Sequence, residues 1–375
     1  LEDHHSHKRS LNHPGVCTIP TALAIAEREK KDGKAFLTAV ILGYEIGSRI
    51  SAANKLGVLN IERGFHESSV VGPFSAVTVT GKLLGLPASQ IAQAYGIGGS
   101  LAAGTMEFKS SEAWSKRLQV GNATRNGIMA TELAREGFTG PPTILDGKHS
   151  FYHSYVHDGN FDLAKVTKAL GASWDINHIQ YKPFACAGVL HATVTAAAKA
   201  REVHTIRPEK IKEVKVFTAS KVVEEYAEPA EIKVIPTNPV GAQFSLQYSV
   251  AAMLVRGKAL LAEFSEEAIH DPQILRIAQL VVPVADRNID SGWPAVDPGE
   301  IEIELVEGKK FRVRVEEAKG DLANPVSDED IIEKFKELAL PFLTTQRIEA
   351  VIAAVKNLET MTSIGVLMEL LKPNR

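Results

Sequence analysis

The sequence predicts an α+β protein: a large multihelical domain built from both chain ends, with an inserted smaller α+β lid domain. Two observations support this fold class. Apolar residues recur at helical spacing through the first half of the 375 residues and again after Asn324-Pro325. Between these regions, short stretches alternate apolar and charged residues, as strands with one buried face do. We therefore expect a helical domain at 1–180, completed by 326–375, and a lid domain at 181–325.

Helical patterns dominate the first domain. We expect helices at Thr21–Lys30, Ala35–Leu56, Ser69–Leu86, Ser89–Ala103 and Gly121–Arg135. The first helix should begin near Pro20, because proline suits the first turn of a helix. The last should end before Gly137, since glycine commonly terminates helices. The apolar faces are mostly Ala, Val, Leu and Gly, so these helices can approach one another closely.

The pattern changes near Tyr181, where strands begin to alternate with helices. We expect strands at Lys210–Phe217, Leu280–Val284, Ile301–Leu305 and Phe311–Val315, and helices at Gly188–Arg201 and Ala242–Val255. The last two strands should form a hairpin through a turn at Gly308, with Glu302 and Glu304 opposite Arg312 and Arg314. Three helices should then complete the helical domain, at Ile331–Leu340, Thr345–Leu358 and Ile364–Leu371.

Composition excludes several classes of function. The net charge is −3 and no basic block carries interleaved aromatic residues, so nothing indicates nucleic-acid binding. No apolar run reaches the roughly 18 residues of a membrane span. Cys17 and Cys186 lie far apart and form neither a disulfide framework nor a Cys-x-x-Cys site. We expect a cytoplasmic protein, or a mitochondrial one if the source is eukaryotic, and the start at Leu1-Glu2-Asp3 suggests that natural N-terminal residues are missing.

Familiar catalytic motifs are absent from the sequence. Gly96-x-Gly98-Gly99 fails the dinucleotide-binding spacing, because Leu101 stands where the third glycine belongs. There is no Gly-x-Ser-x-Gly elbow, Walker A motif or His-Glu-x-x-His pair. His4, His5 and His7 form the densest imidazole group, but their spacing matches no standard zinc site, so we expect a polar terminal segment and no metal.

Several histidines and basic residues each allow two interpretations. His66 precedes two serines at an expected helix start, and alone it is a capping or core histidine. Lys116-Arg117 can be a solvated helix face, Lys182 a surface lysine at the domain boundary, and His191 an ordinary helix residue. Set among small and apolar residues, the same groups can instead bind a small anion.

An ordered series of motifs resembles the MmgE/PrpD family over nearly the whole chain. The matching segments are His13-Pro14-Gly15, Ile19-Pro20-x-Ala22-Leu23-Ala24-x-Ala26-Glu27, Gly43-Tyr44-Glu45-Ile46-Gly47-x-Arg49-Ile50, Gly64-Phe65-His66, Thr80-Gly81-Lys82-Leu83-Leu84-Gly85-Leu86, Tyr95-Gly96-Ile97, Lys116-Arg117, Gly121-Asn122-Ala123, Gly137-Phe138-Thr139-Gly140-Pro141 and Lys182-Pro183-Phe184-Ala185-Cys186 with His191. No single segment is specific, but their order is.

The resemblance implies a function as well as a fold. The family contains 2-methylcitrate dehydratase, cis-aconitate decarboxylase and iminodisuccinate epimerase. Its members pair a helical domain with a smaller α+β lid, usually as a homodimer, and need no metal or organic cofactor. We therefore expect a cofactor-independent lyase that acts on a small di- or tricarboxylate, of the 2-methylcitrate dehydratase type. A decarboxylase or epimerase of the family, and an inactive carboxylate-binding relative, remain alternatives.

The resemblance also assigns roles to residues. His13 and His66 match family histidines that transfer protons or bind carboxylates. Lys116 and Lys182 match lysines that hold substrate carboxylates. We take His13, His66 and Lys116 as the catalytic set. Substrate binding is expected from Lys182, Arg117, His191 and Asp3.

The expected chemistry is consistent with these residue types. Removing a proton beside a carboxylate builds negative charge on that carboxylate. Fixed ammonium groups stabilise this charge more in the transition state than in the ground state. A histidine can take or return the proton, which contributes roughly 10²–10⁴-fold to the rate. Loss of water, loss of CO2 and epimerisation all share such a carbanion-like stage.

The sequence departs from the family pattern at several positions. His4-His5-Ser6 stand where two acids and a threonine are usual, so that only Glu2 and Asp3 remain as possible acids. Gln119 replaces a common histidine. Ala187, followed by Gly188, replaces an arginine, and Val222 or Val223 stands where some decarboxylases have tyrosine. Family members also have helices before the point where this chain begins.

Overall fold

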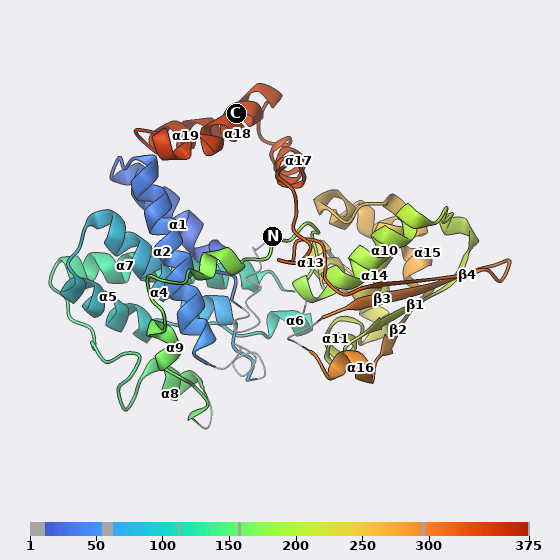
Figure 1. Cartoon of the computed structure of the whole chain (residues 1–375), viewed down its shortest axis with the longest axis horizontal. Coiled ribbons are helices and arrows are strands. Elements are labelled where there is room, and N and C mark those ends of the chain that lie inside the picture. The colour runs from blue at the N-terminus through green and yellow to red at the C-terminus, as the bar shows by residue number, and fades with distance from the viewer. Residues whose placement is uncertain (1–11, 55–62, 112, 157–158, 294–296, 374–375) are drawn as a thin grey trace. The chain divides into compact units, whose positions relative to one another are not determined.

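The computed structural model describes residues 12–54, 63–111, 113–156, 159–293 and 297–373. The chain divides into two compact units, which are described separately. The helical unit comprises the described parts of Glu2–Phe108, Trp114–Gln180 and Phe335–Arg375, and the α+β unit comprises Lys109–Ala113 and Tyr181–Lys334. The predicted fold class is confirmed, because one unit is multihelical and the other contains the strands (Figure 1).

Helix α4 is the centre of the helical unit. It spans Glu67–Leu84 and is buried along almost its whole length. Four helices pack around it. They are α1 (Gly15–Arg28), α2 (Gly33–Ala52), α5 (Ala88–Ser100) and α7 (Ser115–Arg135). A helix that is covered on every side needs apolar or small residues on all its faces, and α4 has them at every position except Glu67 and Lys82.

Small residues let the neighbouring helices reach α4. A Cβ added at Gly127 of α7 would lie 2.4 Å from the Cβ of Ala76 and 2.7 Å from the carbonyl oxygen of Pro73. A Cβ added at Gly72 of α4 would lie 2.6 Å from the Sγ of Cys17 in α1. The close helix packing expected from the small residues is therefore confirmed.

Two helices of the helical unit, α1 and α7, begin well before their predicted starts. Helix α1 begins at Gly15 and contains Pro20, since Thr18 already donates a helical hydrogen bond of 3.0 Å to Pro14. Helix α7 begins at Ser115, six residues before the predicted Gly121. In both cases the residues before the predicted start are already helical, so local sequence signals alone do not place the boundary.

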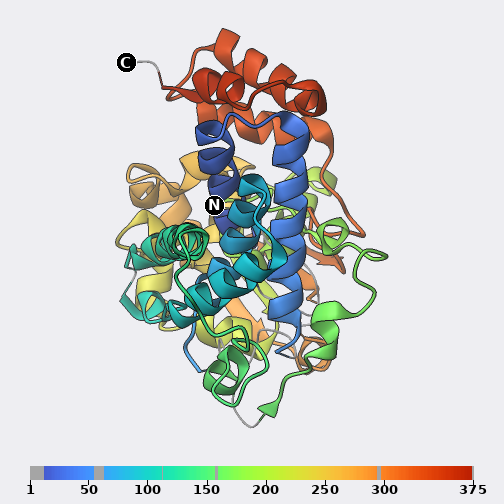
Figure 2. The ribbon, with the colours of Figure 1, turned by 90° about the vertical axis from the view of Figure 1, so that its left-hand side faces the viewer.

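The C-terminal helices join the turn between α1 and α2. Gly33 N donates to the Met361 oxygen at 2.8 Å, and Ile364 N donates to the Lys31 oxygen at 2.9 Å. Figure 2 shows these red helices beside the ends of the blue ones. The remaining helices near or within this unit are α6 (Phe108–Ser111), α8 (Phe151–Tyr155), α9 (Ala164–Thr167), α17 (Asp328–Ala339), α18 (Thr345–Lys356) and α19 (Gly365–Leu371).

A buried ion pair fastens the segment after α9 to α2. Arg49 Nε lies 2.5 Å from Glu45 Oε1, and the two side chains are 5% and 1% exposed. Arg49 also donates to the carbonyls of Lys168 at 2.7 Å and Ser173 at 3.0 Å. Glu45 accepts a hydrogen bond of 2.6 Å from the Asp175 amide. Both charges are therefore satisfied by a segment that has little regular structure of its own.

The α+β unit contains a four-stranded mixed sheet. Its strands are β1 (Ile211–Thr218), β2 (Val281–Ala285), β3 (Gly299–Leu305) and β4 (Lys310–Val315). Their order is β2-β1-β3-β4, with β1 and β2 parallel and the other pairs antiparallel. All four predicted strands are present within one or two residues.

The hairpin register confirms one predicted pair and corrects the other. Glu302 lies opposite Arg312, as expected, but Glu304 lies opposite Lys310. Arg314 lies opposite Glu300 instead, and Glu300 also accepts a hydrogen bond from Arg312. The turn at Gly308, where φ is +84°, sets this register.

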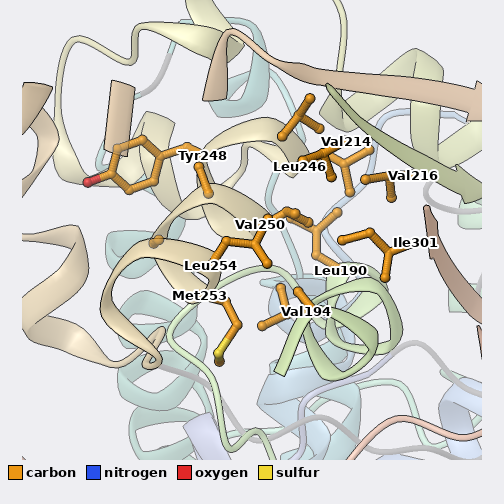
Figure 3. Packing of buried hydrophobic residues seen from close by; sticks show 14 of the residues in the cluster. Leu190, Val194, Val214, Val216, Leu246, Tyr248, Val250, Met253, Leu254 and Ile301 are labelled. Carbon is orange, nitrogen blue, oxygen red and sulfur yellow. The ribbon is translucent and has the colours of Figure 1, made fainter. Parts of the chain in front are cut away.

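Helices α10 (His191–Val203) and α14 (Leu246–Arg256) pack against the sheet, and together with it they form the core of the α+β unit. Figure 3 shows Leu190 and Val194 packed with Val214 and Ile301 of the strands. Helix α14 begins four residues later than predicted, because Ser245 Oγ caps it by accepting the Tyr248 amide at 3.0 Å. The other α-helices are α11 (Ser220–Tyr226), α12 (Ala230–Val234), α13 (Pro239–Gln243), α15 (Pro272–Ala278) and α16 (Arg287–Asp290).

Candidate functional site

The N-terminal ends of helices α1, α4 and α7 lie together in the helical unit. His13 N, just before α1, donates a hydrogen bond of 2.9 Å to Ser68 Oγ in the first turn of α4. Cys17 Sγ lies 3.8 Å from the Ser68 oxygen and 3.6 Å from the Val120 oxygen of α7. Helix N-termini carry partial positive charge and unpaired amide donors, so this meeting point favours a negatively charged group.

His66 stands at the N-cap position of α4. Its side chain does not cap the helix, which removes the capping interpretation. The ring is 4% exposed and lies edge-on to Phe108, with ring centroids 5.6 Å apart. Its Nδ1 lies 2.9 Å from the Oε1 of Gln119 in α7. The imidazole is therefore held on two sides by the helical unit.

A short backbone pairing holds the segment that carries His66. Met106 N donates to the Gly64 oxygen at 2.8 Å, and His66 N donates to the Gly104 oxygen at 3.2 Å. Gly104 has φ +142°, and a Cβ there would lie 2.6 Å from Ser69 Oγ and 3.1 Å from Gln119 Oε1. Only glycine suits both this conformation and this close approach.

Lys116 and Arg117 begin helix α7 but have different surroundings. Lys116 is half-buried and precedes Gln119 by three residues, so both lie on the same face of the helix. Arg117 is exposed, and its guanidinium carbon lies 5.4 Å from the ring centre of the exposed Trp114. The structure thus groups Lys116 with Gln119, which contacts His66, and places Arg117 over Trp114.

Lys182 lies in the α+β unit, where it is 5% exposed. Its carbonyl accepts a hydrogen bond of 2.6 Å from Lys334 Nζ. Burial raises the pKa of the nearby Cys186 thiol to about 12, against the opposing effects of the Lys182 charge and a hydrogen bond with Ser249. Cys186 is therefore a protonated, unreactive thiol at neutral pH. The interpretation of Lys182 as a surface lysine is therefore wrong, because its side chain is buried.

His191 is the first residue of α10 and belongs to the same part of the α+β unit as Lys182. It is 4% exposed and packs edge-on against Phe184, with ring centroids 5.3 Å apart. The Lys182-Pro183-Phe184 motif and His191 are thus linked through the phenylalanine. Asp3, His4, His5 and His7 lie outside the described residues.

The described residues contain neither a cluster typical of a metal site nor a helix suited to cross a membrane. Among the described residues, no group of three or more His, Cys, Asp or Glu side chains is arranged to hold a metal ion. Within the same part of the chain, no helix has the length and apolar character needed to cross a bilayer.

Sequence reasoning missed two groups at the meeting point. Ser68 binds His13 across 55 residues of sequence, and no local pattern predicts such a contact. In the sequence, Gln119 stands out only as a substitution for a common family histidine, yet it contacts the His66 ring. Its position three residues after Lys116 was the one available signal.

Comparisons with known proteins agree on one family. Residues 1–164 match the model of the MmgE/PrpD N-terminal domain, and residues 184–360 match that of the MmgE/PrpD C-terminal domain. The chain is 27% identical to a cis-aconitate decarboxylase of Aspergillus terreus, over 99% of this chain and 78% of the relative. It is 28% identical to the human cis-aconitate decarboxylase, over 96% of this chain and 74% of the relative.

Proposed function

Because the chain belongs to the MmgE/PrpD family, we propose that it is a lyase acting on a small di- or tricarboxylate, with decarboxylation of a cis-aconitate-like acid as its first candidate reaction. The names of its relatives favour decarboxylation. The observation that carries the proposal is the meeting of three helix N-termini, where His13 and His66 also lie. Lyase chemistry of this kind builds negative charge beside a carboxylate, which such a site stabilises.

Decarboxylation of an unsaturated tricarboxylate needs one proton donor and a stabilised carboxylate. The bond between a carboxylate and its CH2 carbon breaks, and CO2 leaves without the bonding electron pair. That pair forms an allylic carbanion, whose negative charge extends to the carbon beside a second carboxylate. A proton added to that carbon gives the product with its double bond shifted. The chemistry therefore needs an acid near the carbon and cations near the remaining carboxylates.

The helical unit supplies groups of both kinds. We assign His66 as the proton donor, because its ring is held in one orientation by Gln119 and Phe108. His13 and Lys116 are assigned to the carboxylates, aided by the helix N-termini. Holding such groups in a fixed, partly dehydrated arrangement lowers the cost of reorganising them during the reaction.

From the α+β unit, we propose that Lys182 binds a carboxylate and that His191 supports it through Phe184. The match of the Lys182-Pro183-Phe184 segment to the family pattern supports this role, and the burial of Lys182 keeps its side chain away from bulk water. Arg117 and Asp3 remain proposed substrate-binding residues on the family resemblance alone. A homodimer is also proposed, and analytical ultracentrifugation would detect it.

Dehydration of a 2-methylcitrate-like substrate is the second candidate. The same groups can run it, because His66 in its neutral form would remove a proton beside a carboxylate before water leaves. Epimerisation of the family type also begins with such a proton transfer. The activities differ in product and not in the groups that they require.

Incubation of the whole chain with cis-aconitate, citrate and 2-methylcitrate would separate these activities. Released CO2 identifies decarboxylation, and proton NMR of the products identifies dehydration. We expect turnover of at least one acid. Calorimetric binding of these acids without turnover would instead show an inactive carboxylate-binding relative. The absence of both binding and turnover would overturn the proposal.

A further inference from the structure

We infer that Gln119 is a positioning residue that fixes the tautomer of His66, keeping a proton on Nδ1 so that proton exchange takes place at Nε2. The catalytic consequence rests on the proposed function. The tautomer itself does not, since it follows from hydrogen bonds within the helical unit. Nothing in the family resemblance assigns this role, because a histidine is common at the position of Gln119.

The Gln119 side-chain amide makes two hydrogen bonds at once. Its Nε2 donates to the carbonyl oxygen of Thr105 at 2.9 Å. Its Oε1 lies 2.9 Å from Nδ1 of His66. Both distances are ordinary for hydrogen bonds between nitrogen and oxygen.

The direction of the amide follows from the Thr105 carbonyl. A backbone carbonyl can only accept, so the Gln119 atom facing it has to be the NH2 group. The other end of the amide is then the oxygen, which can only accept as well. For the contact with His66 to be a hydrogen bond, Nδ1 has to carry the proton. In neutral His66 the lone pair consequently lies on Nε2.

The framework around this contact leaves the amide little freedom to turn. Thr105 is held by the backbone pairing of residues 64–66 with 104–106, which also carries His66. Gln119 comes from α7, and the absent side chain of Gly104 leaves the space in which its Oε1 lies. The Thr105 carbonyl and the His66 ring are thus positioned by the same pair of short segments, and the Gln119 amide connects the two from α7.

This arrangement suits a residue that has to exchange a proton at one defined atom. Protonated His66 gives up the proton on Nε2 and returns to the tautomer that Gln119 already favours. Without Gln119, the neutral ring would populate both tautomers. The loss of one ordinary hydrogen bond changes the ratio of the two tautomers by about tenfold. With both tautomers about equally populated in its absence, we expect the share of the productive tautomer, and with it kcat, to fall by about twofold.

The test uses the full chain with its 12 histidines labelled with ¹⁵N in the ring. Two-bond proton–nitrogen spectra distinguish a protonated ring nitrogen from one with a lone pair, and His66→Gln assigns the His66 signals. Gln119→Met removes both hydrogen bonds while nearly conserving shape. The matched control is Gln346→Met, at an exposed position on α18.

We expect neutral His66 to show a proton on Nδ1 in the wild-type chain and in the control. Gln119→Met should mix the two tautomers and lower kcat about twofold with little change in KM, while the circular dichroism spectrum stays unchanged. A proton on Nε2 in the wild type, or a tautomer unchanged by Gln119→Met, would overturn the inference. The expected tautomer in a chain that turns over none of the acids would support the inference and count against the proposed function.

Discussion

Replacing Arg49 with methionine should destabilise the helical unit by about 3–5 kcal/mol, the usual result of removing one partner of a buried ion pair. The structure explains this magnitude, because Glu45 would stay buried at 1% exposure without its counter-charge. The carbonyls of Lys168 and Ser173 would also lose their donor. Urea unfolding followed by circular dichroism would measure the loss.

Two controls make this prediction specific. The double variant Glu45→Met/Arg49→Met should be less destabilised than Arg49→Met alone, since no unpaired charge remains. Arg125→Met, at an exposed position on α7, should change stability by less than about 0.5 kcal/mol. Trypsin should cleave Arg49→Met faster after Lys165 and Lys168. A loss below about 1 kcal/mol for Arg49→Met would refute the reasoning.

Two further predictions concern an acid in the α+β unit and the packing of α7. Burial raises the pKa of Asp297 from 3.8 to about 7, so the folded chain holds its proton more tightly than the unfolded chain. The free energy of unfolding should therefore fall by up to about 4 kcal/mol as pH rises from 4 to 7, and Asp297→Asn should abolish this fall. If urea unfolding gave the same pH dependence for the wild-type chain and for Asp297→Asn, the prediction would be contradicted. Gly127→Val should destabilise the helical unit by at least about 1–3 kcal/mol, because its side chain would overlap Ala76 and Pro73; an unchanged melting temperature would argue against the packing described.

The fold class followed from the sequence because it depends on periodicity. The strict alternation in β3 and β4 and the apolar spacing of the helices are local patterns, which can be recognised without knowing how the chain packs. The boundaries of α1, α7 and α14 did not follow. The early start of α1 at Gly15 lies beside the contact of His13 with the distant Ser68, and the late start of α14 comes from the Ser245 cap. Nothing in the local sequence marks the early start of α7 at Ser115.

The candidate site was only partly accessible from the sequence. Motifs indicated His13, His66 and Lys116, but not that the N-terminal ends of α1, α4 and α7 meet. That meeting depends on Ser68 and Gln119, whose partners lie 55 and 53 residues away. Pairwise contacts at such separations leave no periodic trace in one sequence.

The most direct test of the account compares kcat/KM for decarboxylation and dehydration between the wild-type chain, His66→Gln and His270→Gln. His270 is exposed and lies in the α+β unit, so its replacement should leave the rate unchanged. Loss of the proton donor should lower the rate of His66→Gln by roughly 10²–10⁴-fold. Turnover by His66→Gln at the wild-type rate would contradict the assignment of His66 and the site built around it.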